Sequence, residues 1–434
     1  MKHILFFLMI PGLLSAQTNM LTLSDVRRAV LDSNPSIRES LQRILAAEAV
    51  LRQAKSAYLP TVSLSGSYGA TDTSRHPEAD IQHRYRDSFN QLGGSLQANW
   101  VLFDGFARRA RTLSATYDVR RTEQLADDTR RLLLLSATAS FRQAQLAAEN
   151  VRVLEQDRHF NRILEDDARK RFNAGSVPET DVFNFSIRAL QAESSVFQAQ
   201  LDYQTACTVL AELMALPDGR LPDTMQPAVV NADLPETQPV PDNELQYALA
   251  HRPDYQAVES GRLALEQQVR VAKGNLLPNV SLIGSVNYTE NENVSSVENY
   301  GDYDSFIGIG AQWDLFSGGR KMSEIIKAMA DLRALGEQRE ALRLSIRSGI
   351  QSRIDEARTA RAVFEKQKQI YDLSVKVRDS VEKSYKAGVA TITRLNEAQT
   401  DLTRAEGAVA SARISSLLAL EQLDAETGRI LETP

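Results

Sequence analysis

The sequence predicts a mainly α-helical chain that is internally duplicated and carries a few long amphipathic β-strands. Three observations predict this class. The 434 residues are only 6% aromatic and rich in Ala, Leu, Gln, Glu and Arg, a composition that favours long helices packed on other helices. The second observation is an internal repeat, and the third is a regular alternation of apolar and polar residues in four segments.

The chain begins with the pattern of a secretory signal peptide. Lys2 supplies a positive charge, residues 4–14 are apolar, and small residues follow up to Gln17. Such a run is too short to span a bilayer as a helix. We expect residues 1–17 to be removed on export, and we expect no lipid anchor because no cysteine follows the cleavage region.

The internal repeat is the most informative feature. The pattern Leu-Pro-x-Val-Ser-Leu-x-Gly begins at Leu59 and returns at Leu277, 218 positions later. The pattern Trp-x-Leu-Phe-x-Gly begins at Trp100 and returns at Trp313, 213 positions later. A repeat of this kind predicts two copies of one structural unit.

These offsets set the expected domain organisation. Residues 18–216 form the first repeat, with a helix, two strands and a long helical hairpin, and residues 242–434 form the second. Between them, residues 217–241 hold six of the 14 prolines and cannot be one helix. We expect this stretch to be an equatorial linker outside the helical wall.

Four segments of about ten residues alternate apolar and polar side chains, which is the length and pattern of tilted membrane-spanning strands. They are residues 62–70, 92–100, 280–289 and 307–315. Four strands cannot close a barrel, and lipid does not tolerate open sheet edges. Two copies would give eight strands around a filled interior, whereas three would give 12 strands and a lumen. A homotrimer is therefore the assembly compatible with transport.

Long helices lie between the strand pairs. Residues 107–174 contain no Pro or Gly, and a second long helical stretch begins near Met322. Apolar residues recur every seven positions, as in a coiled coil, and we expect them to form the core. They are Leu125, Leu132, Ala139, Leu146, Val153 and Phe160, and later Ile350, Ala357, Phe364 and Tyr371. Gly175 and Gly388 end the two stretches, and a return helix follows each.

Composition excludes several functions. The formal net charge is −6 and no basic run is present, so a nucleic-acid partner is not expected. No nucleophile has a plausible histidine and acid partner, and no metal-ligand or phosphate-loop pattern occurs. We expect no catalytic residue, no metal and no cofactor, and hence no enzyme.

The two long helical stretches end in a shared Phe/Tyr-x-Ala-Gly pattern, which begins at Phe172 and returns at Tyr385. Together with the repeat and the strand patterns, it makes the sequence resemble the TolC-like outer-membrane efflux protein family over nearly all of the mature chain. The resemblance implies a trimeric 12-stranded β-barrel, with four strands per subunit, continued by a periplasmic α-helical barrel. It also implies a passive duct in the outer membrane that works with a periplasmic adaptor protein and an inner-membrane transporter.

The resemblance also implies roles for particular residues. The hairpin tips that dock the adaptor would be Ala174, Gly175, Ser176 and Val177, with Ala387, Gly388 and Val389. Tyr385 and Asp181 stand at the positions of the family's periplasmic gate link, and Arg394 and Glu397 stand at its aperture positions. Ala390 replaces an arginine of that latch, and Arg394 replaces an acidic residue, so the two aperture side chains could pair instead of presenting only negative charge. From their places at strand ends, Trp100 and Trp313 are expected to be membrane girdle residues.

Two alternatives remain open at this stage. One is a duct dedicated to type I protein secretion, which the sequence does not separate from small-molecule efflux. The other is a non-conducting periplasmic coiled-coil scaffold. Four strand segments with a lipid-like face argue against the scaffold, because a scaffold does not need them.

Overall fold

The computed structural model describes residues 19–75, 85–222, 225–228, 239–292 and 300–432, so the expected signal peptide at residues 1–17 lies outside the described part. The chain divides into two compact units, and each unit draws on both repeats. The first, here called the hairpin unit, comprises the chain up to Leu41, Ala126–Pro253 and the chain from Leu342; the second, the sheet unit, comprises Gln42–Leu125 and Asp254–Ala341.

The helices of the two halves match in length, since each helix of the first half has a counterpart of the same length, within one residue, in the second. The pairs are α1 (Leu23–Ser33) and α5 (Pro241–His251), α2 (Pro35–Ser56) and α6 (Pro253–Gly274), α3 (Ala107–Asn173) and α7 (Arg320–Lys386), and α4 (Glu179–Leu213) and α8 (Ile392–Thr427). The chain is thus mostly helical, as predicted. None of the described helices has both the length and the apolar character needed to cross a bilayer.

Each repeat has two leading helices where the sequence analysis expected one. The first pair breaks at Asn34, before Pro35, and the second breaks at Arg252, before Pro253. Both residues adopt extended backbone angles, because the proline ring disfavours a helical conformation in the residue before it.

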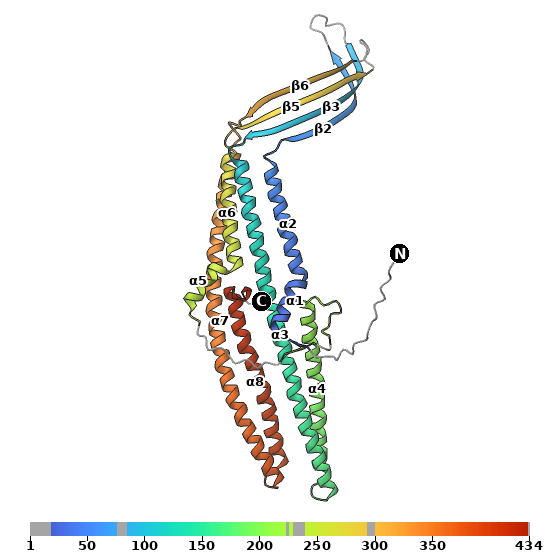
Figure 1. The fold of residues 1–434 in the computed structure, drawn as a ribbon, viewed down its shortest axis with the longest axis vertical. Helices are drawn as coiled ribbons and strands as arrows, with labels where there is room; N and C mark the ends of the chain where they lie inside the picture. Colours follow the sequence, from blue (N-terminus) through green and yellow to red (C-terminus); the bar gives the residue numbers. More distant parts are fainter. Residues whose placement is uncertain (1–18, 76–84, 223–224, 229–238, 293–299, 433–434) are drawn as a thin grey trace, which may run out of the picture. The chain divides into compact units, whose positions relative to one another are not determined.

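The sheet unit contains one antiparallel sheet in the order β2-β3-β5-β6, seen in Figure 1. Its strands are β2 (Thr61–Arg75), β3 (Tyr85–Phe103), β5 (Asn279–Glu292) and β6 (Tyr300–Gln312). Thr61 opposes Asn99 in the first hairpin, and their repeat counterparts Asn279 and Gln312 oppose each other in the second. The two hairpins therefore have the same register.

The predicted alternation places the apolar side chains on one face of the sheet. Leu64 opposes Leu96, and Leu96 in turn opposes Val286 on the next strand. On the other face Ser95 donates a hydrogen bond to Asn287 at 2.7 Å, and Asn287 donates to Asp304 at 2.8 Å. The sheet therefore has one apolar face and one polar face.

The strand bounds differ from the prediction in two ways. All four strands exceed ten residues, because main-chain pairing continues into polar residues that carry no alternation signal. The fourth strand ends at Gln312, not at residue 315, and leaves Trp313 beyond it. Its counterpart β3 continues to Phe103 by pairing with β5 past a bulge, whereas β6 lies at the sheet edge and has no second neighbour among the described strands.

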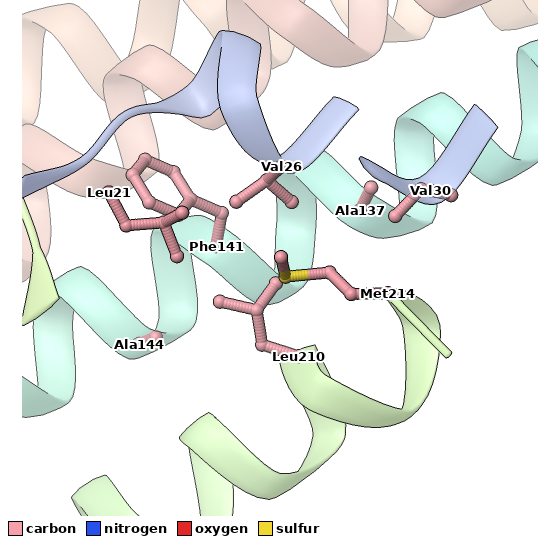
Figure 2. Close-up of a cluster of buried hydrophobic side chains, with 8 residues drawn as sticks. All are labelled: Leu21, Val26, Val30, Ala137, Phe141, Ala144, Leu210 and Met214. Atoms are coloured by element: carbon pink, nitrogen blue, oxygen red, sulfur yellow. The ribbon is translucent and has the colours of Figure 1, made fainter. Parts of the chain in front are cut away.

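The hairpin unit holds a compact core where α1, α3 and α4 meet. Figure 2 shows its eight buried side chains, which are Leu21, Val26, Val30, Ala137, Phe141, Ala144, Leu210 and Met214. Beside it β1 (Asn19–Leu21) pairs in parallel with β4 (Met225–Pro227), which lies in the predicted linker. Strands of three residues carry no periodic signal, so the sequence does not predict this pair.

The heptad prediction for the core is only partly right. Ile350 and Val153 are buried, but Leu125 and Leu132 are each 48% exposed in the single chain. The buried series on α3 runs instead through Leu134, Ala137, Phe141 and Ala144. In the single chain the neighbours of α3 cover the stripe through Leu134 and Phe141 and leave the heptad stripe through Leu125 and Leu132 uncovered.

Candidate functional site at the hairpin ends

The hairpin unit ends in two tips that connect α3 to α4 and α7 to α8, visible as the two lower turns in Figure 1. Both helices stop in the same way. Gly175 has φ +72° and Gly388 has φ +76°. At the first tip the N–H of Ser176 donates to the carbonyl of Arg171, and the N–H of Gly175 donates to the carbonyl of Phe172. At the second tip the N–H of Val389 donates to the carbonyl of Ser384, and the N–H of Gly388 donates to the carbonyl of Tyr385. These are Schellman motifs, which require a residue that tolerates positive φ.

The tips present their side chains to solvent. Val389 is 82% exposed, and a Cβ atom placed on Gly175 or Gly388 would meet no other atom within 4 Å. Thr391 caps the return helix α8, because its hydroxyl accepts a hydrogen bond from the backbone N–H of Arg394 at 3.3 Å. The predicted docking residues thus lie on turns with open space around their glycines. The helix after the second turn has a side-chain cap, whereas α4 after the first turn begins behind Pro178 without one.

A small apolar core fixes the tips from beneath. Its buried members come from three helices: Leu164 and Ala168 of α3, Val182 and Phe185 of α4, and Leu395 of α8. Tyr385 packs against this cluster from the end of α7. The two hairpins are therefore joined to each other close to their ends.

The aromatic ring of Tyr385 lies among charged groups. The guanidinium of Arg171 stands 5.3 Å from the ring centroid and pairs with Asp167 at 2.9 Å. Burial is the main cause that raises the pKa of the Tyr385 hydroxyl; the carboxylates of Asp167 and Asp181 add to the rise, and Arg171 opposes it. In the described chain no hydrogen bond joins Tyr385 to Asp181, although Asp181 is near enough to act on the hydroxyl electrostatically.

The two predicted aperture residues meet within one chain. Arg394 Nη1 lies 3.3 Å from Glu397 Oε2, one helical turn away on α8. Both side chains are exposed, so the pair contributes little to stability. The pair instead affects the local charge, because the guanidinium of Arg394 offsets the negative charge of the Glu397 carboxylate beside it.

Trp100 and Trp313 lie elsewhere, in the sheet unit. The indole N–H of Trp100 donates to the carbonyl of Tyr58 at 2.9 Å, and that of Trp313 donates to the carbonyl of Leu276 at 2.9 Å. Tyr58 and Leu276 are repeat counterparts. Each indole therefore ties the exit of its second strand to the approach to its first strand, while its ring stays exposed.

Sequence reasoning missed Arg171 as a member of the site. The repeat hides it, because its counterpart in the second tip is Ser384. Its position directly before Phe172, the counterpart of Tyr385, is the only sequence signal that pointed to it.

The fold combines a four-stranded antiparallel sheet with two long helical hairpins. The family model for "Outer membrane efflux protein" matches residues 26–216 and 245–429. The chain is 26% identical over 389 residues to the outer membrane efflux protein BepC of Brucella suis, covering 87% of this chain and 78% of that protein. It is 24% identical over 399 residues to the outer membrane protein TolC of Escherichia coli, covering 89% and 78%.

Solved structures of the same fold include two outer membrane proteins. VceC of Vibrio cholerae matches with a TM-score of 0.74 at 18% identity, covering 94% of this chain and 96% of that one. The CmeC outer membrane channel of Campylobacter jejuni matches with a TM-score of 0.78 at 15% identity, covering 94% and 85%. The chain belongs to the outer membrane efflux protein family. It is a channel protein of the outer membrane that extends into the periplasm.

Proposed function

We propose that the chain is one of three identical subunits of a passive export duct in a tripartite system. Three copies would pool their strands into a 12-stranded barrel in outer-membrane lipid, and the helical hairpins would form a periplasmic conduit. A periplasmic adaptor protein would dock at the tips, and an inner-membrane transporter would supply the energy.

One observation carries this proposal: the four-stranded sheet has an apolar face that is exposed and two open edges. Val62 and Leu64 on β2 and Ile307 and Ile309 on β6 are all at least 66% exposed. A sheet of this kind is not stable against water, and its edges are not stable in lipid. Pairing of β2 with β6 between copies satisfies both requirements, with the apolar face toward lipid and the polar face toward a lumen.

The remaining site residues have proposed roles in this duct. Tyr385 and Asp181 would link neighbouring helices when the periplasmic end is closed, with Arg171 holding the Tyr385 ring. Arg394 and Glu397 would line the aperture as neutralised pairs, which predicts weaker cation selectivity than an all-acidic ring. Trp100 and Trp313 would sit at the membrane boundary, where an aromatic ring with a satisfied N–H is favourable.

Two measurements test this proposal: channel conductance and the mass of the oligomer. Purified protein is reconstituted in a planar lipid bilayer, and its oligomeric mass is measured in detergent. We expect a trimer and discrete channel openings. A monomeric or dimeric mass would overturn the 12-strand assembly, and a trimer that never conducts would favour the periplasmic scaffold.

A duct dedicated to type I protein secretion remains the second candidate. The chain is also 24% identical over 372 residues to protein CyaE of Bordetella pertussis, so its relatives do not all carry the name of an efflux protein. Co-purification of an adaptor with a transporter that carries a peptidase-like or a drug-binding domain would separate the two functions.

A further inference from the structure

A pocket with a volume of about 430 Å³ lies in the sheet unit, where α3 begins and α6 ends. Its lining combines apolar side chains with three cationic ones, and we call it the basic pocket. The apolar side chains are Phe106, Ala110, Leu113 and Leu277, and the cationic ones are Arg109, Arg270 and Lys273.

The positive charge of the basic pocket is not balanced within it, because no carboxylate is among its lining residues. Arg270 donates a hydrogen bond to the side-chain carbonyl of the buried Gln267 at 3.3 Å, which orients it without neutralising it. Within the described part of the chain, Arg109 and Lys273 form no ion pair. Such a concentration of positive charge, in a chain of net charge −6, suits an anionic ligand.

A second cavity of the sheet unit shows the contrasting arrangement. Arg111 and Arg320 are among its lining residues. A guanidinium nitrogen of Arg111 lies 3.6 Å from a carboxylate oxygen of Asp104, and one of Arg320 lies 2.8 Å from a carboxylate oxygen of Glu324. These cations are paired inside the chain, whereas those of the basic pocket are left for a ligand to neutralise.

The aromatic member of the basic pocket, Phe106, has a backbone conformation that its residue type disfavours. Its φ is +65°, in the left-handed region that costs free energy for any residue with a Cβ atom. The counterpart of Phe106 in the second repeat is Gly319, with φ +82°, so the turn can be made with glycine. Phe106 is also 67% exposed. Neither the strain nor the exposed ring stabilises the chain in water, so Phe106 indicates a contact outside the chain.

Phe106 continues the apolar face of the sheet beyond the last strand residue. A bulge in β3 sets Phe103 opposite Val280 of β5. Val280 lies on the same face as Val286, because residues an even number apart on a strand share a face. The ring of Phe106 packs edge-on against the ring of Phe103, with 5.4 Å between the centroids. The basic pocket therefore begins where the apolar face ends.

We propose that the basic pocket binds the headgroup of an anionic phospholipid, with the phosphate at the three cations and the Phe106 ring beside the acyl chains. The inference rests on the proposed duct, because it requires the apolar face of the sheet to lie in lipid. The lipid belongs to the periplasmic leaflet, since α3 begins at this pocket and ends at the first hairpin tip. Arg and Lys side chains at a membrane surface attract anionic lipids. A soluble phosphate would contact the cations but would have no use for Phe106.

The second repeat does not carry the same set of groups. The counterparts of Phe106 and Arg109 are Gly319 and Met322, so both the aromatic ring and one of the three cations are missing there. We therefore expect one tightly bound phospholipid per subunit.

Native mass spectrometry of the full-length protein in detergent tests this proposal by counting bound lipids. The protein is titrated with phosphatidylglycerol and, separately, with phosphatidylcholine that has the same acyl chains. We expect phosphatidylglycerol to bind about tenfold more tightly, at one molecule per subunit. Equal binding of the two lipids would overturn the proposal. So would displacement of phosphatidylglycerol by an equal concentration of inorganic phosphate, because the pocket would then be a site for soluble anions.

Two pairs of substitutions locate the bound lipid. Arg109→Gln with Lys273→Gln should weaken phosphatidylglycerol binding about tenfold. The matched control, Arg111→Gln with Arg320→Gln, removes the same charge from paired residues and should change the affinity less than about twofold. An equal loss in both double variants would mean attraction by net charge alone and would overturn the pocket.

Phe106→Gly separates a lipid contact from a packing role, because it installs the residue type of the second repeat and removes the strain. We expect weaker phosphatidylglycerol binding together with a melting temperature that is unchanged or higher. A lower melting temperature with unchanged lipid binding would make Phe106 a packing residue and overturn its proposed contact with lipid.

The mass of the oligomer, read from the same spectra, distinguishes a failure of this proposal from a failure of the duct. A conducting trimer that binds both lipids equally would overturn the headgroup pocket and leave the duct intact. A monomer whose phosphatidylglycerol binding depends on Arg109 and Lys273 would overturn the trimeric duct and leave the pocket.

Discussion

At the residue scale, the best-defined contacts are those that both repeats make with the same geometry. Asn34 donates to the carbonyl of Leu213 at 2.9 Å, and its counterpart Arg252 donates to the carbonyl of Glu426 at 2.9 Å. Each side chain stands at the break between the two leading helices and satisfies a carbonyl at the end of a return helix. Arg252 adds an ion pair with Glu426 at 2.6 Å.

This pairing makes Arg252→Ala a strongly destabilising change. Arg252 is buried, so its removal leaves a carboxylate and a carbonyl without their partner, at a cost of about 3 kcal/mol. Arg252→Asn, which restores the residue type of the first repeat, should retain part of that stability. The measurement is the free energy of unfolding from a denaturant titration. Arg404→Ala, which breaks an exposed pair with Asp401, is the control and should change this free energy by less than about 0.5 kcal/mol.

Conductance tests the proposed gate. Tyr385→Phe and Asp181→Asn should each raise single-channel conductance, because either change removes one partner of the link. The raised pKa of Tyr385 means that the hydroxyl stays protonated through neutral and mildly alkaline pH. The difference between wild type and Tyr385→Phe should therefore be constant from about pH 6 to pH 9. If neither variant conducts more than wild type, the latch is wrong.

At the element scale, the sequence predicted the long helices, their glycine ends and the alternating faces of the strands, since each has a periodic or conformational signal of its own. It did not predict β1 and β4, or the breaks at Asn34 and Arg252, which depend on contacts remote in sequence or on one proline. The site shows the same limit. Gly175 and Gly388 could be found from sequence, but Arg171 joins Tyr385 only through the packing of two hairpins.

The tips can be tested without straining the backbone. A bulky residue at Gly175 or Gly388 would add the cost of positive φ, roughly 1–2 kcal/mol, to any effect on docking. Val389→Trp avoids this cost because Val389 is exposed and is not among the residues with positive φ. We expect it to lower export in cells while conductance of the purified protein is unchanged. Export at the wild-type level would argue against the second tip as the docking surface.

The repeat also predicts the register between copies at the sheet edges. Asn99 opposes Ile283 within the chain, and the repeat offsets carry this pair to Gln312 on β6 and Ser65 on β2. Gln312→Cys with Ser65→Cys, in the Cys207→Ser background, should therefore cross-link two copies. Ser63→Cys with Gln312→Cys is the control, because a diagonal neighbour lies about 7–8 Å away. Stronger linking of the control would mean that the register between copies is shifted.

At the scale of the whole molecule, a contact between β6 of one copy and β2 of the next is head-to-tail, so it either closes into a ring or continues as a filament. The number of copies decides the interior: eight strands leave room only for side chains, and 12 strands leave a lumen. The cross-linked Gln312→Cys and Ser65→Cys variant measures that number directly. We expect a ladder on a non-reducing gel that contains a linear dimer and a trimer and stops there. A ladder that ends at the dimer would mean a barrel without a lumen, and products beyond the trimer would mean a larger ring or an open assembly.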